Sequence, residues 1–152
     1  MNIFVLDLEP EKCAVYHCDK HVVKMLLESA QMLSTAVRMS GINKGYKACY
    51  QNHPCTKWVR KSVDNWLWLR DLVFALNAEW KDRFDHLYNH KSFEVVKKLP
   101  VPNIKDIGLT PFALAMPEGY KQKDAVSSYR NYYMGDKRHI AKWRNGKPWW
   151  WK

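Results

Sequence analysis

The sequence lacks any apolar run that approaches the ~20 residues a helix needs to span a bilayer. It also lacks a basic N-terminal segment followed by an apolar one, which is the pattern of a secretory signal. We therefore expect no membrane association and a cytoplasmic location. In that compartment the four cysteines, Cys13, Cys18, Cys49 and Cys55, are expected to stay reduced.

Several chemical signatures are also missing. There is no phosphate-binding Gly-x-x-x-x-Gly-Lys-Ser/Thr loop, no Gly-x-Gly-x-x-Gly after a strand and no Gly-x-Ser-x-Gly turn, so ATP hydrolysis, dinucleotide redox chemistry and serine hydrolysis are excluded. Dispersed carboxylates such as Asp64 and Asp71 do not form the pattern of a two-metal nuclease. No compact Cys-x-x-Cys pair is present either. We expect no cofactor and no metal.

Zinc is the alternative that stays open, because thiolate and imidazole ligands recur early in the chain. Cys13, His17 and His21 follow one another at four-residue intervals, as on one face of a helix. The full candidate set is Cys13, His17, Cys18, His21, His53 and Cys55. The other interpretation is that these cysteines are small buried residues and that His53 satisfies a helix start.

The patterning predicts an all-α fold, a compact helical bundle that forms one domain over residues 1–152. Helices are expected from Pro10 toward Cys18, from Asp19 to near Ser40 and Gly41, from Pro54, from Ser62 onward, and over Asp124 to Met134, with another turn at residues 139–143. Residues 2–6 are expected to be a brief strand or an extended lead-in. Residues 99–119 contain four prolines and predict a long irregular crossing.

The helix from Ser62 carries the clearest core pattern. Its apolar side chains recur at intervals of three and four residues, which places them on one face. The expected core face consists of Trp66, Leu69, Val73, Leu76, Trp80 and Phe84. We assign no catalytic or binding role to this face.

The helix that begins at Asp19 carries the most informative polar pattern. At about 100° per residue, His21, Lys24, Glu28, Gln31 and Thr35 fall on one narrow stripe. The opposite side is expected to hold Val22, Val23, Leu26, Leu27, Ala30, Leu33 and Val37. A cation, an anion and an imidazole held between apolar borders are typical of a cleft wall, although a polar stripe is also how a solvated helix face looks.

Positive charge is concentrated at the C-terminus. The net charge is +10, and the last 33 residues carry nine Lys or Arg against two Asp. Tyrosines and tryptophans are interleaved with these cations, and such a mixture suits phosphates and stacked bases. The candidate nucleic-acid-binding residues are Lys20, Arg130, Tyr132, Tyr133, Lys137, Arg138, Lys142 and Arg144. Some of the rings must instead close the core, and a basic segment also suits an acidic protein partner.

Two resemblances follow from longer motifs. CDKHVVKM at 18–25, ESAQMLST at 28–35, NHPCTKW at 52–58, TPFALAMP at 110–117 and YRNYY at 129–133 resemble a family of small phage-encoded proteins. Separately, Asp19-Lys-His21 with Glu28 seven residues after the histidine resembles the early helix of the phage pyrimidine-dimer DNA glycosylases of the endonuclease V type. The basic aromatic YRNYY segment with Gly135 is similar to the C-terminal segment by which those all-α enzymes hold damaged DNA.

This second resemblance implies that Glu28 is a catalytic carboxylate. In such an enzyme an amine attacks a sugar carbon to form an imine, and the carboxylate assists proton transfers and strand cleavage. His21 and Lys24 are expected beside it in the site. Opening the damaged site requires that a base leave the stack.

The sequence departs from that family at two points. The family uses an N-terminal Thr exposed by removal of the initiator Met, whereas Asn2 follows Met1 here and such a Met is usually retained. Arginines that flank the family's Glu are replaced by Leu27 and Gln31. The amine is therefore the Met1 α-amino group or a lysine such as Lys20 or Lys24, and a simple i,i+4 ion pair is the other role for Lys24 with Glu28.

We predict a small phage DNA-acting protein, a glycosylase and lyase on damaged or modified bases that works through an amine and Glu28. DNA is the expected partner, and the protein would act in the cytoplasm of the infected host cell. The alternatives are a non-enzymatic nucleic-acid-binding module and a phage effector that binds and inhibits a host protein.

Overall fold

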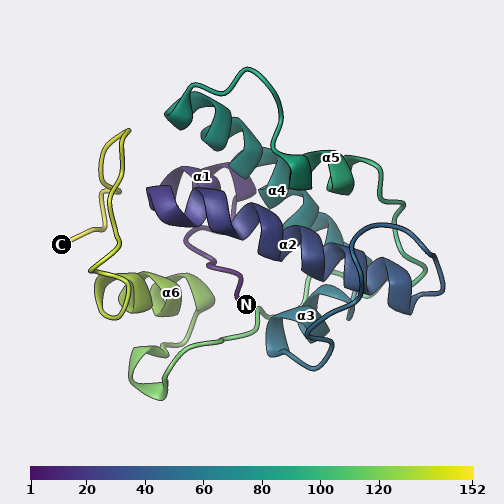
Figure 1. Ribbon diagram of the computed structural model, residues 1–152. Helices are drawn as coiled ribbons and strands as arrows, with labels where there is room; N and C mark the ends of the chain where they lie inside the picture. The colour runs from purple at the N-terminus through teal and green to yellow at the C-terminus, as the bar shows by residue number, and fades with distance from the viewer.

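α2 and α4 are the two long helices, and they pack against each other through the middle of the protein (Figure 1). The computed structural model describes residues 1–152 and contains six α-helices, one short 3-10 helix and no strand, so the all-α prediction is confirmed. In chain order the elements are α1 (Pro10–Tyr16), α2 (Asp19–Met39), α3 (Pro54–Val59), α4 (Val63–Phe84), α5 (Lys91–Lys97), η1 (Glu118–Tyr120) and α6 (Ala125–Met134).

The core face of α4 is buried over most of its length. Trp66, Leu69, Val73 and Leu76 are each at most 1% exposed. The Trp66 indole N–H also donates to the Leu33 carbonyl of α2 at 3.2 Å, which satisfies its polar atom inside the apolar contact. The prediction is confirmed for these four positions.

The other two residues of this face, Trp80 and Phe84, also pack against the core but are only half-buried. Trp80 is half-buried, and its ring stacks on His86 with the centroids 3.6 Å apart. The chain turns sharply just beyond α4, where Asp85 adopts a left-handed φ of 54°, and this turn folds His86 back onto the helix end. Trp80 therefore lies at the edge of the core.

The ends of the first two helices have local causes. Pro10 occupies the first turn of α1, as predicted, but α1 ends at Tyr16 because His17 is extended, with ψ 133°. α2 ends as predicted: the Ser40 N–H reaches the Ala36 carbonyl at 3.1 Å, and Gly41 follows with φ +97°, a conformation that favours glycine.

Two parts of the outline were not predicted correctly. The short α5 was missed, because its seven residues follow polar loop residues and carry no long apolar period. The expected turn of helix at residues 139–143 is absent; that segment forms irregular turns. Residues 2–6 are extended and form no strand, so the extended lead-in is the alternative that is confirmed.

The predicted irregular crossing over residues 99–119 is confirmed up to the short η1. Side chains of α3 and α4 fasten it to the bundle. Asn65 accepts from the Thr110 N–H at 2.9 Å and donates to its hydroxyl at 2.8 Å, while the Trp58 ring stacks on Phe112 with centroids 4.7 Å apart. The crossing thus carries the chain to α6, on the far side of the N-terminal segment (Figure 1).

The C-terminal rings serve mainly to close the core. Trp150 is 5% exposed, and the Trp143 indole N–H donates to the Tyr16 carbonyl at 2.9 Å. Trp149, in contrast, is 77% exposed. None of the helices is both long and apolar enough to cross a membrane.

Candidate active site

The polar stripe of α2 faces the interior of the protein at three of its five positions. His21, Glu28 and Thr35 are buried, so this stripe is not a solvated helix face. Val23 and Leu27, which were expected on the buried side, are instead 41% and 44% exposed. The expectation for these two residues is wrong because the N-terminal segment and α6 cover the polar side of the helix, which leaves Val23 and Leu27 uncovered.

Residues 3–6, the N-terminal strap, pass through the core in an extended conformation. Ile3, Phe4, Val5 and Leu6 are at most 4% exposed. Their burial contributes on the order of 1.5 to 3 kcal/mol per large apolar side chain. This holds the chain start deep in the molecule, next to the middle of α2 (Figure 1).

Asn2 fixes the position of the strap. Its side-chain N–H donates to the Ala115 carbonyl at 2.9 Å, and its side-chain oxygen accepts from the Ile3 N–H at 2.8 Å and the Tyr129 hydroxyl at 3.0 Å. Ala115 belongs to the irregular crossing and Tyr129 to α6, so no local pattern in the sequence indicated this role.

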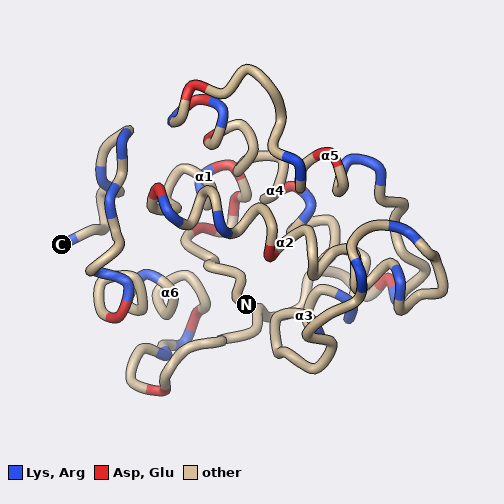
Figure 2. The backbone as a smooth tube through the Cα atoms, in the orientation of Figure 1, with Lys and Arg blue, Asp and Glu red and all other residues tan.

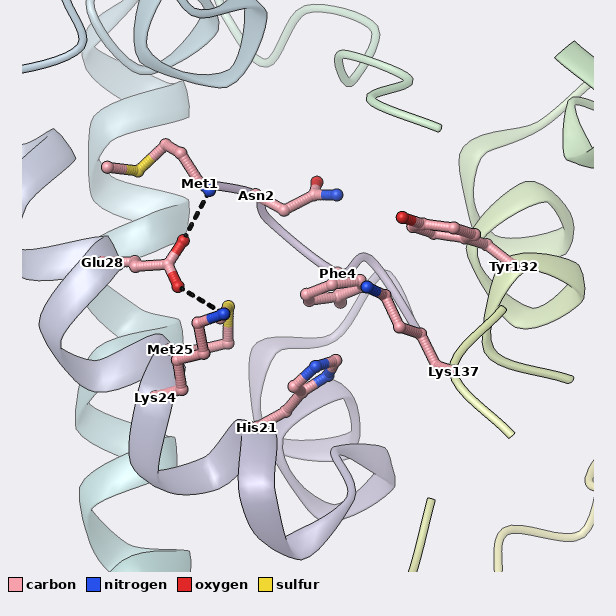
Figure 3. Close-up of a pocket in the computed structure, with 9 residues that line it drawn as sticks. All are labelled: Met1, Asn2, Phe4, His21, Lys24, Met25, Glu28, Tyr132 and Lys137. Carbon is pink, nitrogen blue, oxygen red and sulfur yellow. Dashed lines mark ion pairs between the residues drawn. The ribbon is translucent and has the colours of Figure 1, made fainter. Parts of the chain in front are cut away.

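The Met1 α-amino group lies 3.0 Å from Glu28 Oε1, and the Lys24 ammonium lies 3.7 Å from Glu28 Oε2 (Figure 3). The Met1 side chain is 4% exposed and the Glu28 side chain 11%, whereas Lys24 is 68% exposed. Glu28 Oε1 has no aligned hydrogen-bond donor, so the Met1 ammonium is the group that balances its charge. The buried amine beside the carboxylate is therefore the chain terminus.

His21 is held by two aromatic neighbours. Its Nδ1 lies 2.6 Å from the Tyr133 hydroxyl, and its ring stacks on Phe4 with centroids 4.3 Å apart. Burial, with smaller contributions from His17, Lys137 and Lys24, lowers the pKa of His21 to about 3. The imidazole is therefore neutral at physiological pH.

The hydrogen bonds of Tyr133 favour one tautomer of that imidazole. The Tyr133 oxygen accepts from the Cys18 backbone N–H at 3.3 Å, which leaves its own proton for the His21 nitrogen in preference to the Cys18 sulfur, 3.7 Å away. With Nδ1 as acceptor, the proton of the neutral ring is on Nε2. In this tautomer His21 presents an N–H donor in the pocket.

The opposite wall comes from the C-terminal part of the chain (Figure 3). The Lys137 ammonium lies 5.1 Å from the centre of the Tyr132 ring and 5.9 Å from that of Phe4. Together these walls enclose a pocket of about 160 Å³. Its lining residues are Met1, Asn2, Phe4, His21, Lys24, Met25, Glu28, Tyr132 and Lys137.

The candidate zinc ligands do not converge. No group of three or more His, Cys, Asp or Glu side chains is arranged to hold a metal ion. Burial raises the pKa of Cys13 to about 12 and that of Cys55 to about 11, so both are neutral thiols. His53 instead begins α3, where its ring nitrogen accepts from the Cys55 N–H at 3.1 Å. That alternative prediction for His53 is confirmed.

Of the candidate DNA-binding residues, some point into the protein and others are exposed to solvent. Arg130 turns inward, where it donates to the Leu6 carbonyl at 3.0 Å and pairs with Asp7 at 3.4 Å, and Tyr133 is fully buried. The structure thus places both where they support the strap and His21. Exposed positions are occupied by Lys20, Arg138, Lys142 and Arg144. Figure 2 shows basic residues along the C-terminal segment, beside α6 and the start of α2.

Sequence comparison gives one positive result. A family model described as pyrimidine dimer DNA glycosylase matches residues 1–93. Neither the curated proteins nor the solved structures yielded a match. The matched range includes Met1, His21 and Glu28, whereas Tyr132 and Lys137 lie beyond it.

Proposed function

Because this chain belongs to the pyrimidine dimer DNA glycosylase family, we propose that it is a DNA glycosylase and lyase whose nucleophile is the Met1 α-amino group and whose catalytic carboxylate is Glu28. The observation that carries the proposal is the 3.0 Å separation of these two groups in a pocket. The family supports DNA as the substrate and gives no support to a host protein as partner.

The first step uses the amine. Once deprotonated, the α-amino nitrogen attacks C1′ of the damaged nucleotide and forms an N–C1′ bond, while the C1′–base bond breaks and its electron pair leaves with the base, which takes up a proton. The C1′–O4′ bond then opens, O4′ is protonated and an imine joins Met1 to the sugar. In model peptides α-amino groups lose their proton about two to three pH units below lysine side chains, which favours a chain terminus as nucleophile.

Glu28 is placed to move protons in these steps. Its Oε1 is within hydrogen-bond distance of the amine, so it can accept the proton that the attacking nitrogen loses. In the lyase step the carboxylate removes a C2′ proton, the C3′–O bond breaks and the 3′ strand leaves with its phosphate. Water then hydrolyses the imine and restores the amine.

Neutral His21 and the nearby cations complete the proposed site. The His21 Nε2–H has no partner within the protein and is a donor for a sugar or phosphate oxygen of the substrate. Lys24, at the pocket rim, and Lys137, on the opposite wall, are placed to neutralise phosphates next to the reacting sugar. Lys20, Arg138, Lys142 and Arg144 extend this positive surface, to which Tyr132 adds a ring.

Borohydride trapping tests this function. The protein is incubated with end-labelled duplexes that carry an abasic site, uracil or a UV dimer, and borohydride reduces any imine to a stable amine. We expect a covalent adduct on the abasic duplex and a base-release product on the dimer duplex. Glu28→Gln should abolish both, whereas Glu11→Gln, a matched change at an exposed position of α1, should leave both at the parental level.

Two results would contradict the proposal. Undiminished adduct with Glu28→Gln would remove the carboxylate from the mechanism. Salt-sensitive binding of all duplexes with no adduct and no cleavage would identify the protein as a nucleic-acid-binding module instead.

A further inference from the structure

Tyr50 combines an unusual backbone with an unusual location. It precedes α3 in the loop after α2, and its φ of 47° is left-handed, a conformation that is uncommon for any residue other than glycine and costs on the order of 1 to 3 kcal/mol. Only one other non-glycine residue of the chain, Asp85, has a positive φ.

The backbone on both sides of Tyr50 is fastened to neighbouring helices. The Thr35 hydroxyl of α2 accepts from the Cys49 N–H at 3.1 Å and lies 3.3 Å from the Cys49 carbonyl. The Tyr50 carbonyl accepts from the His53 N–H at 3.0 Å, and Arg60 donates to the Gln51 carbonyl. The left-handed conformation is therefore held in place by the structure around it.

The Tyr50 ring makes no specific contact that would stabilise the fold. Tyr50 is 64% exposed, and its side chain makes no hydrogen bond, aromatic contact or cation–π contact within the protein. A strained backbone that presents an unpartnered ring to solvent is the pattern of a functional position.

Tyr50 lines a second pocket, which shares Met1, Lys24 and Glu28 with the active-site pocket. This pocket, of about 330 Å³, is formed by Met1, Lys24, Glu28, Gln31 and Tyr50. Tyr88 and Trp149 are also strongly exposed, at 83% and 77%, but neither lines a pocket that contains Glu28. Tyr50 is thus a strongly exposed aromatic residue in a pocket that Met1 and Glu28 also line.

We propose that Tyr50 is a stacking residue that receives a nucleobase next to the reacting sugar and positions that sugar against the Met1 amine. The inference rests on the proposed DNA glycosylase function. A flat ring beside the Lys24 cation is the combination by which proteins hold unpaired bases, because the ring stacks on the base and the cation neutralises the adjoining phosphate. Tyr50 and Tyr132 would then bracket the substrate from two of the pockets that Glu28 lines.

Kinetics on the abasic duplex test the positioning role. We expect Tyr50→Ala to lower kcat/KM for adduct formation about ten-fold or more, the value of one base–aromatic stack, and Tyr50→Phe to stay near the parental value because it keeps the ring. Tyr88→Ala is the matched control and should leave kcat/KM unchanged. Parental kcat/KM in Tyr50→Ala would overturn the proposal.

Photocrosslinking locates the ring on the DNA independently of catalysis. A duplex with 5-iodouracil beside the abasic site should crosslink to Tyr50, as identified by mass spectrometry of the tryptic peptide. Crosslinks to Tyr88 or Trp149 without Tyr50 would overturn the proposal. If wild-type protein forms no borohydride adduct at all, the proposed function fails, and a Tyr50 crosslink would still establish the stacking contact.

Melting separates this role from a structural one. Glycine adopts a positive φ without strain, so Tyr50→Gly should melt at or above the parental temperature while it loses kcat/KM as Tyr50→Ala does. A clearly lower melting temperature for Tyr50→Gly would mean that the ring supports the fold, which would contradict the inference.

Discussion

The hydroxyl of Tyr129 donates a 3.0 Å hydrogen bond to the side-chain oxygen of Asn2, across 127 positions of sequence. The single proton of this hydroxyl is shared with the Ala113 carbonyl, 2.7 Å from the hydroxyl oxygen, and the oxygen accepts from the Ala115 N–H at 3.2 Å. Tyr129 lies outside the range of the family match, yet it fixes the residue that follows the proposed nucleophile. The C-terminal part of the chain therefore helps to position the amine at Glu28.

Tyr129→Phe tests that relationship. Removing the hydroxyl leaves several buried polar groups without a partner, so the free energy of unfolding should fall by about 1 to 3 kcal/mol, and adduct formation should slow. Denaturant unfolding and borohydride trapping measure the two effects. Tyr120→Phe, which removes a hydroxyl bonded to Asp136 at the surface, should change both much less. Equal effects of the two variants would contradict the positioning role of Tyr129.

Two tryptophans of α4 provide a paired test of the core. Trp66 is fully buried, and Trp66→Ala should lower the free energy of unfolding by about 3 to 5 kcal/mol through lost burial and the cavity left behind. Trp80→Ala should cost less, because that ring is half-buried and stacks on His86. Urea unfolding of both variants checks the order. A larger loss for Trp80→Ala would contradict the packing described for α4.

Stability should fall in mild acid because of buried histidines. Burial lowers the pKa of His17 to about 4 from an ordinary value of 6.5, and its Nδ1 lies 2.7 Å from the Cys13 carbonyl. Because the folded pKa is below the unfolded one, the unfolded chain binds the extra proton between these two values. The contribution of neutral His17 to the free energy of unfolding is therefore complete above about pH 6.5 and is lost as the pH falls toward 4. Each such histidine lowers the free energy of unfolding by no more than about 1.4 kcal/mol per pH unit.

His17→Gln should remove one proton from this dependence. Measured by urea unfolding between pH 7 and 5, its slope should be shallower than that of the parental protein, in which His21 also contributes with a folded pKa of about 3. His139→Gln, at an exposed position, should keep the parental slope. A parental free energy of unfolding that does not change over this pH range would disprove the account.

Salt dependence should locate the DNA-binding face. Replacing Arg138, Lys142 and Arg144 together by Ala should weaken duplex binding and reduce the slope of log K against log salt by about two to three. A charge-matched control replaces Lys61, Lys98 and Lys105, which are exposed elsewhere on the protein. If the control flattens the slope and the C-terminal triple variant does not, the DNA lies on another face.

The sequence predicted the features that depend on residues close to one another in the chain. Intervals of three and four residues predicted α2 and α4, and the resemblance to the glycosylases placed Glu28 and His21 together in the site. The outward position of Val23 and Leu27 was not predictable from α2 alone, because it depends on what covers the opposite side. In the same way, Asn2 and Tyr50 acquire their roles from residues that are distant in sequence, Tyr129 and Ala115 for the first and Met1 and Glu28 for the second.

Peptide mapping of the trapped adduct tests the central claim most directly. After borohydride reduction on an abasic duplex, nuclease and protease digestion leaves the reduced sugar on the residue that formed the imine, and mass spectrometry identifies that residue. We predict the modification on the α-nitrogen of an N-terminal peptide that begins with Met1, and its loss when that nitrogen is acetylated beforehand. A sugar attached to Lys24 or Lys137, with the N-terminal peptide unmodified, would contradict the assignment of the Met1 amine as the nucleophile.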